Sequence, residues 1–191
     1  GAKPGGSILL KKPDACRPCK WYGDGLGFCP DEIVEGATET IVAQGPGENE
    51  EKDGIPFCGD TGEKLNQRFL PLASLERGKV NVCNILKCRQ TVGGRKVNDL
   101  PSNPHERREI AEFCSNAHLR IPSSTKTIIA HGSLAWETLT KSHLNVHDWR
   151  GYVQEIDIYV LQQQGKEQNE REKALLGNLR KVEREGTPEC K

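Results

Sequence analysis

Short apolar runs alternate with longer stretches of mixed polarity along this chain, and that alternation predicts strands followed by helices. Four runs have the length and composition of buried strands, and they cover residues 40–44, 80–86, 127–131 and 156–161. Three of the mixed stretches are predicted to be helical, over residues 62–75, over residues 104–119 and from residues 133–139 onward. Asn103 is a suitable N-cap for the second helix, because Pro104 then takes its first position.

Alternating strands and helices predict an α/β protein with a parallel sheet that helices cover on both faces. One domain is expected over residues 1–191. Its first 38 residues are predicted to be irregular, and residues 166–191 are predicted to form a charged helix or a tail. Sites in such folds lie beyond the carboxyl ends of the strands, so the loops after Gln44, Asn84 and His131 are the candidate site loops.

Charge is unevenly distributed although the formal net charge is zero. Residues 31–63 contain ten acidic residues against one basic residue, and residues 87–126 contain eight basic against four acidic ones. The zero net charge argues against a polycation that coats nucleic acid. The two segments are interpreted either as a backbone-binding face beside a reactive pocket or as ordinary solvated surface.

No run of 18 apolar residues is present, so no membrane span is expected. The sequence also has no charged-then-apolar leader. We therefore expect a cytoplasmic protein.

Eight cysteines are more compatible with a metal site than with disulfides in a cytosolic chain of this length. Cys16 and Cys19 form a CxxC pair, on which the distant Cys88 and Cys114 could converge. Four thiolates suit a [4Fe–4S] cluster or a tetrahedral zinc ion, and the sequence does not choose between them. The other four are assigned to the core or left free: Cys83 in a strand, and Cys29, Cys58 and Cys190.

Several motifs, in order along the chain, resemble those of the iron–sulfur (family 4) uracil-DNA glycosylases. Residues 43–59 (AQGPGENEEKDGIPFCG) resemble its first motif, Gly-Glu-Ala-Pro-Gly followed by acidic residues and Gly-x-Pro-Phe-x-Gly. Residues 82–89 (VCNILKCR) resemble its second strand motif, residues 132–135 its Gly-Ala-Thr-Ala turn, and residues 150–151 its Arg-Gly. Cys16, Cys19, Cys88 and Cys114 fall where that family holds its [4Fe–4S] cluster.

The resemblance implies a three-layer α/β/α sandwich with a central parallel sheet of four strands, a monomer, and a site that binds a base flipped out of DNA. Phe57 matches the aromatic residue that stacks on the base, with a plain core residue as the alternative. Asn84 matches the side chain that hydrogen-bonds to the base edge, with a turn cap as the alternative. Backbone N–H groups from Gly45 to Gly47 could hold an anion or orient a water. The cluster is expected to be structural.

Three features depart from the family pattern. Gln44 replaces the catalytic Glu, and Gln can neither take a proton from water nor stabilise a cationic sugar by charge. Residues 161–165 (LQQQG) lack the His-Pro-Ser motif, whose His helps the base to leave. A longer segment between Cys88 and Cys114 resembles the basic loop of the uracil-crosslinking branch, but it has Asn98 and Asp99 where a covalently reacting His would be, so no covalent chemistry is expected.

Substitutes for the lost groups are present. Glu48 is the preferred stand-in carboxylate, and a solvated loop acid is the alternative. His131 is proposed to replace the missing His or to touch a phosphate, and a packed strand-end histidine is the alternative. Arg95 and Lys96 are candidate contacts to the DNA backbone, unless they belong to a solvated loop.

The leading hypothesis is a DNA glycosylase that excises a modified or damaged base rather than plain uracil. Some relatives in the superfamily remove hypermodified cytosines from phage DNA, so a role in antiviral defence is included beside DNA repair. The alternative is a catalytically inactive DNA-binding or replication accessory module of the same fold. A zinc- or disulfide-stapled protein of unrelated function is a third possibility.

Overall fold

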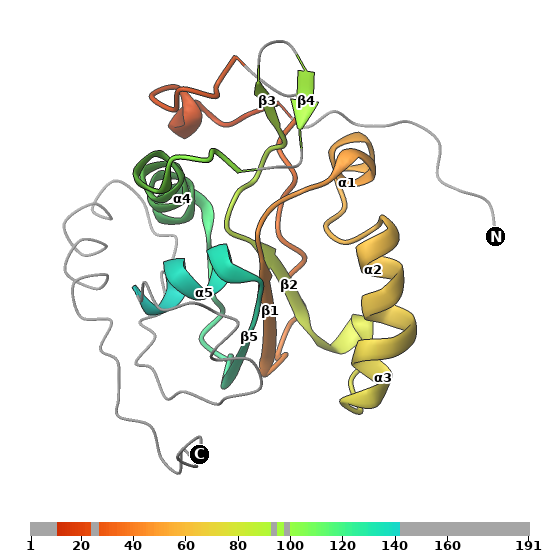
Figure 1. Cartoon of the computed structure of the whole chain (residues 1–191). Helices are drawn as coiled ribbons and strands as arrows, with labels where there is room; N and C mark the ends of the chain where they lie inside the picture. The colour runs from red at the N-terminus through yellow and green to blue at the C-terminus, as the bar shows by residue number, and fades with distance from the viewer. Residues whose placement is uncertain (1–10, 24–26, 93–94, 98–99, 142–191) are drawn as a thin grey trace, which may run out of the picture.

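The structure, a computed structural model, describes residues 11–23, 27–92, 95–97 and 100–141. Its centre is a parallel sheet with the strand order β2-β1-β5 (Figure 1). The strands are β1 (Glu39–Ala43), β2 (Asn81–Asn84) and β5 (Thr127–His131), and β1 pairs in parallel with both neighbours. The predicted α/β class and parallel sheet are confirmed. The described part of this sheet has three strands rather than the expected four. The fourth predicted strand, residues 156–161, lies outside the described residues. The predicted C-terminal helix or tail, residues 166–191, also lies outside them.

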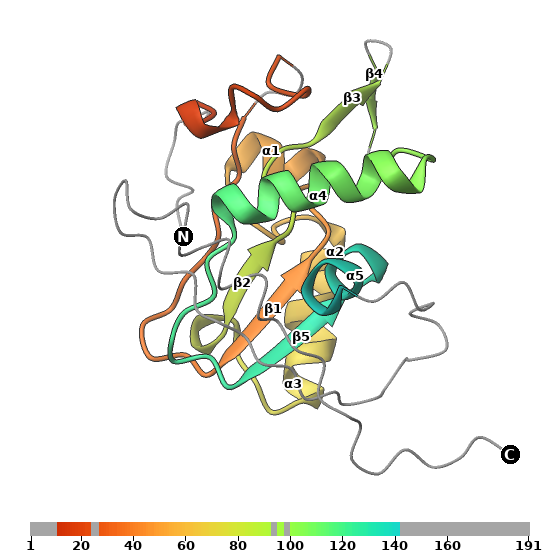
Figure 2. The ribbon, with the colours of Figure 1, turned by 90° about the vertical axis from the view of Figure 1, so that its left-hand side faces the viewer.

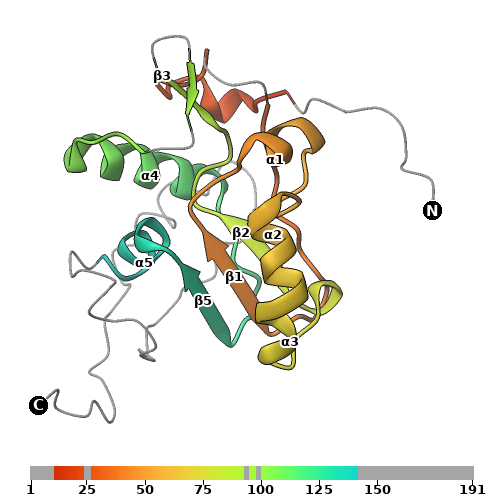
Figure 3. The same ribbon diagram turned by 45° about the vertical axis from the view of Figure 1, so that its right-hand side comes forward.

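Side chains of the sheet alternate between two apolar clusters, as the period of two in a strand requires. Ile41 and Val82 pack with Leu65 on one side, whereas Val42 and Cys83 pack on the other side with the helices that cover it. Cys83 is therefore a core residue, as predicted. Figures 1 and 3 show helices on both faces of the sheet, which gives three layers over the described residues.

One face carries a single helical rod, and the other carries two separate helices. The rod consists of α2 (Asp60–Lys64), a π-helical turn (Leu65–Phe69) and α3 (Leu70–Leu72), where one helix over residues 62–75 is predicted. The opposite face is covered by α4 (Pro104–His118) and α5 (Ser133–Thr140). Asn103 caps α4 as predicted, because its side chain accepts a hydrogen bond from the His105 N–H over 2.9 Å.

Two elements arise where loops are expected from the sequence. The acidic segment after the first glycine loop forms α1 (Glu48–Asp53), which ends at Gly54 in a left-handed conformation (φ 68°). The segment after Cys88 forms an antiparallel ribbon of β3 (Gln90–Val92) and β4 (Arg95–Val97). Figure 2 shows this ribbon at the same end of the molecule as the N-terminal segment that carries a 3₁₀ turn, Asp14–Cys16. No helix among the described residues is long and apolar enough to cross a membrane.

Gly62 allows α2 to approach the backbone of Phe57. A Cβ atom at Gly62 would lie 1.7 Å from the Phe57 carbonyl oxygen, far inside van der Waals contact. Phe57 itself has a positive φ of 54°, which side chains rarely adopt. Because Gly62 has no side chain, the loop of Phe57 can pack directly against the helix.

We predict that Gly62→Ala lowers the free energy of unfolding by about 1–3 kcal/mol, because the Phe57 loop or the helix must shift. Gly78→Ala is the matched control, since a Cβ atom there meets nothing within 4 Å. Urea unfolding of both variants measures the difference. Equal stability of the two variants would show that the close approach at Gly62 is not a structural requirement.

Candidate active site

Three residues form a row across the carboxyl end of the sheet. Ala43, the last residue of β1, is in register with Asn84 on β2 and with His131 on β5. Residues in register on neighbouring strands project to the same face, and Ala43 packs in the cluster of Phe57 and Leu65. Asn84 and His131 thus flank Ala43 on the face of the sheet that α2 covers, roughly 10 Å apart by the usual strand spacing.

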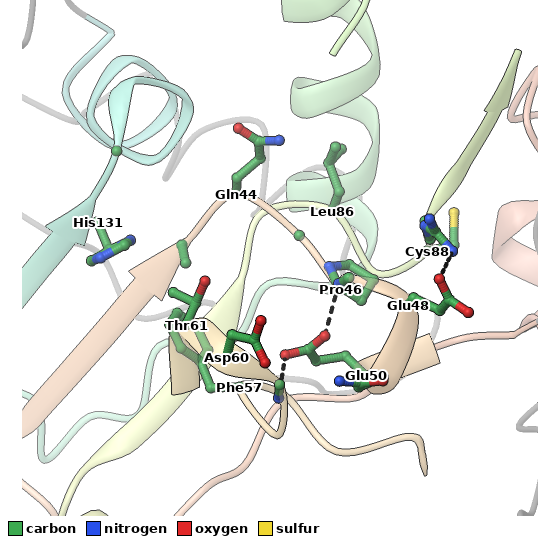
Figure 4. A pocket seen from close by; sticks show the side chains of 17 residues that line it. Gln44, Pro46, Glu48, Glu50, Phe57, Asp60, Thr61, Leu86, Cys88 and His131 are labelled. Atoms are coloured by element: carbon green, nitrogen blue, oxygen red, sulfur yellow. Dashed lines mark hydrogen bonds and ion pairs between the residues drawn. The ribbon is translucent and has the colours of Figure 1, made fainter. Parts of the chain in front are cut away.

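A cavity of about 630 Å³ opens at this end of the sheet, and Ala43 and His131 are on its lining whereas Asn84 is not. Its walls are the loop after β1, the start of α1, the start of α2, the loop after β2 and the end of β5 (Figure 4). The predicted site residues on its lining are Gln44, Gly45, Glu48, Phe57 and His131. The cavity thus lies at the strand ends where the sequence places the site, and the functional role of these residues stays a prediction.

Phe57 contacts His131 at the cavity. Phe57 is 7% exposed, and its ring meets the His131 imidazole edge-on, with 6.0 Å between the ring centroids. Phe57 is thus both a member of the apolar cluster and a wall of the cavity. A base that entered the cavity would meet an aromatic ring that is already held in place.

Glu50 lines the cavity and has a structural role that the sequence did not predict. It is 8% exposed, and its two carboxylate oxygens accept hydrogen bonds from the Gly47 N–H (3.1 Å) and the Gly59 N–H (2.9 Å). Side chains at positions 47 and 59 would crowd this carboxylate, because a Cβ atom would lie 2.7 Å and 3.1 Å from its oxygens. Glu50 therefore ties the first glycine loop to the loop of Phe57. Its position three residues after the helix N-cap Gly47 was the available signal.

Glu48 lies at the rim and already has cationic partners. Its side chain is 56% exposed, and its carboxylate pairs with Lys52 at 2.6 Å and with Arg89 at 3.7 Å. Arg89 also lies 4.0 Å from the buried Glu51. These contacts attach α1 to the loop after β2.

Gln44 follows β1 directly, and backbone hydrogen bonds between the β1 and β2 segments continue through it. Its carbonyl oxygen accepts a hydrogen bond from the Leu86 N–H over 2.9 Å, and the Ala43 carbonyl accepts one from the Ile85 N–H. The next residue, Gly45, comes close to Leu86, whose Cβ atom would be 3.1 Å from a side chain at position 45. The loop is thereby held against the end of β2.

A buried ion pair anchors the end of β2. Lys87 is 1% exposed, and its ammonium group contacts the Asp31 carboxylate and the Asn84 carbonyl oxygen. The same Asp31 oxygen accepts a hydrogen bond from the Asn84 N–H over 3.1 Å. The Asn84 side chain is also buried, and its Oδ1 has no hydrogen-bond partner among the described residues. A buried acceptor is therefore left without a partner at the end of β2, in register with Ala43, which lines the cavity.

Arg95 and Lys96, the predicted contacts to the DNA backbone, lie in β4 of the antiparallel ribbon. The predicted ligands Cys16, Cys19, Cys88 and Cys114 come from three distant segments. Burial and the neighbouring Cys19 and Cys16 raise the pKa of Cys88 to about 11, and burial together with Cys88 and Cys16 raises that of Cys114 to about 12. The Cys88 thiol is thus within electrostatic reach of the other three.

Whether these thiols fit a metal depends on the size of the metal group. Among the described residues, no three His, Cys, Asp or Glu side chains come together closely enough for a single ion. A four-iron cluster is larger than one ion and takes its four cysteines from further apart. A neighbouring thiolate disfavours ionisation of each thiol, and a cationic cluster would reverse that effect. The donor set fits a cluster better than a zinc ion.

The chain was compared with known proteins. The profile of the Uracil DNA glycosylase superfamily matches residues 30–176. The chain belongs to this superfamily. It is 28% identical over 148 residues to a type-4 uracil-DNA glycosylase of Sulfurisphaera tokodaii, covering 76% of this chain and 67% of that protein. It is 29% identical over 155 residues to that of Thermotoga maritima, covering 75% and 74% respectively. Within the uracil-DNA glycosylase superfamily, the chain is a divergent member of the family 4 branch.

We predict that Lys87→Met lowers the free energy of unfolding by about 3–5 kcal/mol, because it leaves the Asp31 carboxylate buried without its partner. The double variant Lys87→Met with Asp31→Leu should recover part of this loss, since no buried charge remains. Lys79→Met is the control: its ion pair with Glu76 is 3.0 Å long, with both side chains more than 70% exposed, and its loss should cost at most about 1 kcal/mol. Urea unfolding of all three provides the measurement, and wild-type stability of Lys87→Met would refute the anchoring role.

Proposed function

We propose that this chain is a DNA glycosylase that flips a base out of DNA and hydrolyses its N-glycosidic bond. The observation that carries the proposal is the cavity at the carboxyl end of the sheet, which Ala43, Phe57 and His131 line, with the buried Asn84 in register with Ala43. A flipped base costs a few kcal/mol in lost stacking and pairing. Stacking on Phe57 and a hydrogen bond to the open Asn84 Oδ1 would recover part of that cost.

We further propose that the base is modified or damaged rather than plain uracil. Gln44 stands where the family has its catalytic Glu, so the chemistry designed around that carboxylate is altered. A cavity of about 630 Å³ lies in the range of sites that enclose whole drug-sized ligands. That volume leaves room beside a pyrimidine ring for a substituent, which supports hypermodified cytosine in phage DNA, and hence antiviral defence, as the first substrate to test.

The alternative is a catalytically inactive DNA-binding or replication accessory module. It is favoured by Gln44 and by the ion pairs that engage Glu48, the predicted stand-in carboxylate. The two proposals differ in whether another carboxylate faces the sugar of a bound nucleotide. Under either one, Arg95 and Lys96 remain candidate contacts to DNA phosphates.

The decisive assay incubates the protein with DNAs that contain uracil, hypoxanthine, hydroxymethyluracil, hydroxymethylcytosine or glucosylated hydroxymethylcytosine. Alkali then reveals abasic sites. We expect strand cleavage with one modified base and little with uracil, because the site lacks the family Glu. In Asn84→Ala, cleavage should fall by about 10²-fold or more, through loss of a hydrogen bond to the flipped base. DNA binding without any cleavage would support the inactive module instead.

We also propose that Cys16, Cys19, Cys88 and Cys114 hold a [4Fe–4S] cluster. The proposal is supported by the electrostatic reach of the Cys88 thiol to the other three and by the family 4 relatives. When bound, the cluster would supply a structural cross-link rather than electrons. Its cysteines would join the N-terminal segment to the loop after β2 and to α4, which positions Asn84 and Arg89 next to the site.

Metal analysis tests the cluster. We expect brown protein with about four iron atoms per chain, and loss of colour and iron in Cys88→Ser and Cys114→Ser. Cys58→Ser is the control, because Cys58 is exposed and its Sγ lies 3.7 Å from the Asp53 carboxylate. Stoichiometric zinc in colourless protein would show that the site holds zinc rather than a cluster.

A further inference from the structure

Three carboxylates line the cavity: Glu48, Glu50 and Asp60. Both oxygens of Glu50 are occupied by backbone N–H groups, and Glu48 is paired with Lys52 and Arg89 at the rim. Asp60 is exposed to the cavity and forms no hydrogen bond or ion pair with any residue that the structure describes. Its carboxylate is therefore available to a substrate without breaking an existing contact.

The position of Asp60 is set by the same contacts that hold Phe57. Asp60 is the first residue of α2 and follows Gly59, whose N–H is bound by Glu50. Gly62, two residues onward, packs against the Phe57 backbone. Figure 4 shows Asp60 beside Thr61 and Phe57 on the wall of the cavity, with Gln44 and His131 also on its lining. The carboxylate thus stands on a rigid element rather than on a free loop.

We infer that Asp60 is the catalytic carboxylate of this site and takes the part that Gln44 cannot perform. The inference rests on the proposed glycosylase function. Cleavage of the bond between C1′ and the base nitrogen leaves the electron pair on the base and positive charge on the sugar, which a nearby carboxylate stabilises. The oxygen of a water then bonds to C1′, one of its protons passes to Asp60, and the departing base takes a proton from solvent.

An acid in the first turn of a helix also stabilises the helix through its dipole, so the test must separate the two effects. Glu63→Gln is the matched control, because Glu63 is the other acid in the first turn of α2, lies off the cavity lining and bonds to Gln67 over 2.9 Å. Both substitutions remove one negative charge from the same helix end. Only Asp60→Asn removes a carboxylate from the cavity.

The experiment measures single-turnover cleavage and DNA affinity of the full-length protein on whichever DNA of the panel is cleaved. We expect Asp60→Asn to lower the cleavage rate by about 10²- to 10⁴-fold, with DNA affinity and thermal stability close to those of Glu63→Gln. Asp60→Glu should recover part of the rate, because it restores a carboxylate.

Three outcomes would overturn the inference. A full rate in Asp60→Asn beside a large loss in Glu48→Gln would give the role to Glu48 and leave the glycosylase proposal standing. Equal losses of rate in Asp60→Asn and Glu63→Gln would reduce Asp60 to a helix-stabilising residue. Wild-type protein that binds DNA but cleaves none of the panel would overturn the glycosylase proposal itself, and the role of Asp60 with it.

Discussion

The buried ammonium group of Lys87 is the constraint on which the architecture around the site depends. A charge taken out of water costs several kcal/mol unless it is paired and hydrogen-bonded, and here the Asp31 carboxylate and the Asn84 carbonyl provide those contacts. Satisfying Lys87 brings the N-terminal segment onto the end of β2, where Cys29 also donates its N–H to the Lys87 carbonyl over 2.7 Å. Asn84 and Cys88, on either side of Lys87, are positioned by the same pair.

A second constraint divides the acidic residues of the site by role. Glu50 is used internally, because its carboxylate joins two glycine loops, and the absent side chains of Gly47 and Gly59 make room for it. Glu48 stabilises α1 and its contact with Arg89. Asp60 alone among the cavity-lining acids has no partner in the described part of the chain. Acidic residues close in sequence thus differ in function because their local partners differ.

Much of the fold followed from local patterns. The three strands of the parallel sheet fall within two residues of their predicted bounds, since apolar runs of that length must be buried. The Asn103 cap is a local hydrogen bond that Asn and Pro together specify. The acidic helix α1 was predicted as a loop, because it has no apolar periodicity. Its first turn is instead stabilised by the Glu50 carboxylate, which accepts a hydrogen bond from the Gly47 N–H. The ribbon of β3 and β4 was also missed, because its strands have only three residues each.

The sequence by itself determined the α/β class, the strand ends beside which the cavity lies, and several of the residues that line it. Those features depend on periodicity, spacing and motif, which are properties of neighbours along the chain. Only the tertiary structure decided that Lys87 and Asp31 are a buried pair, that Glu48 is engaged at the rim and Glu50 between two loops, and that Asp60 faces the cavity. Burial and pairing are made between distant segments, such as those of Asp31 and Lys87, which are 56 residues apart. The chemistry of a carboxylate depends on what those distant segments place beside it.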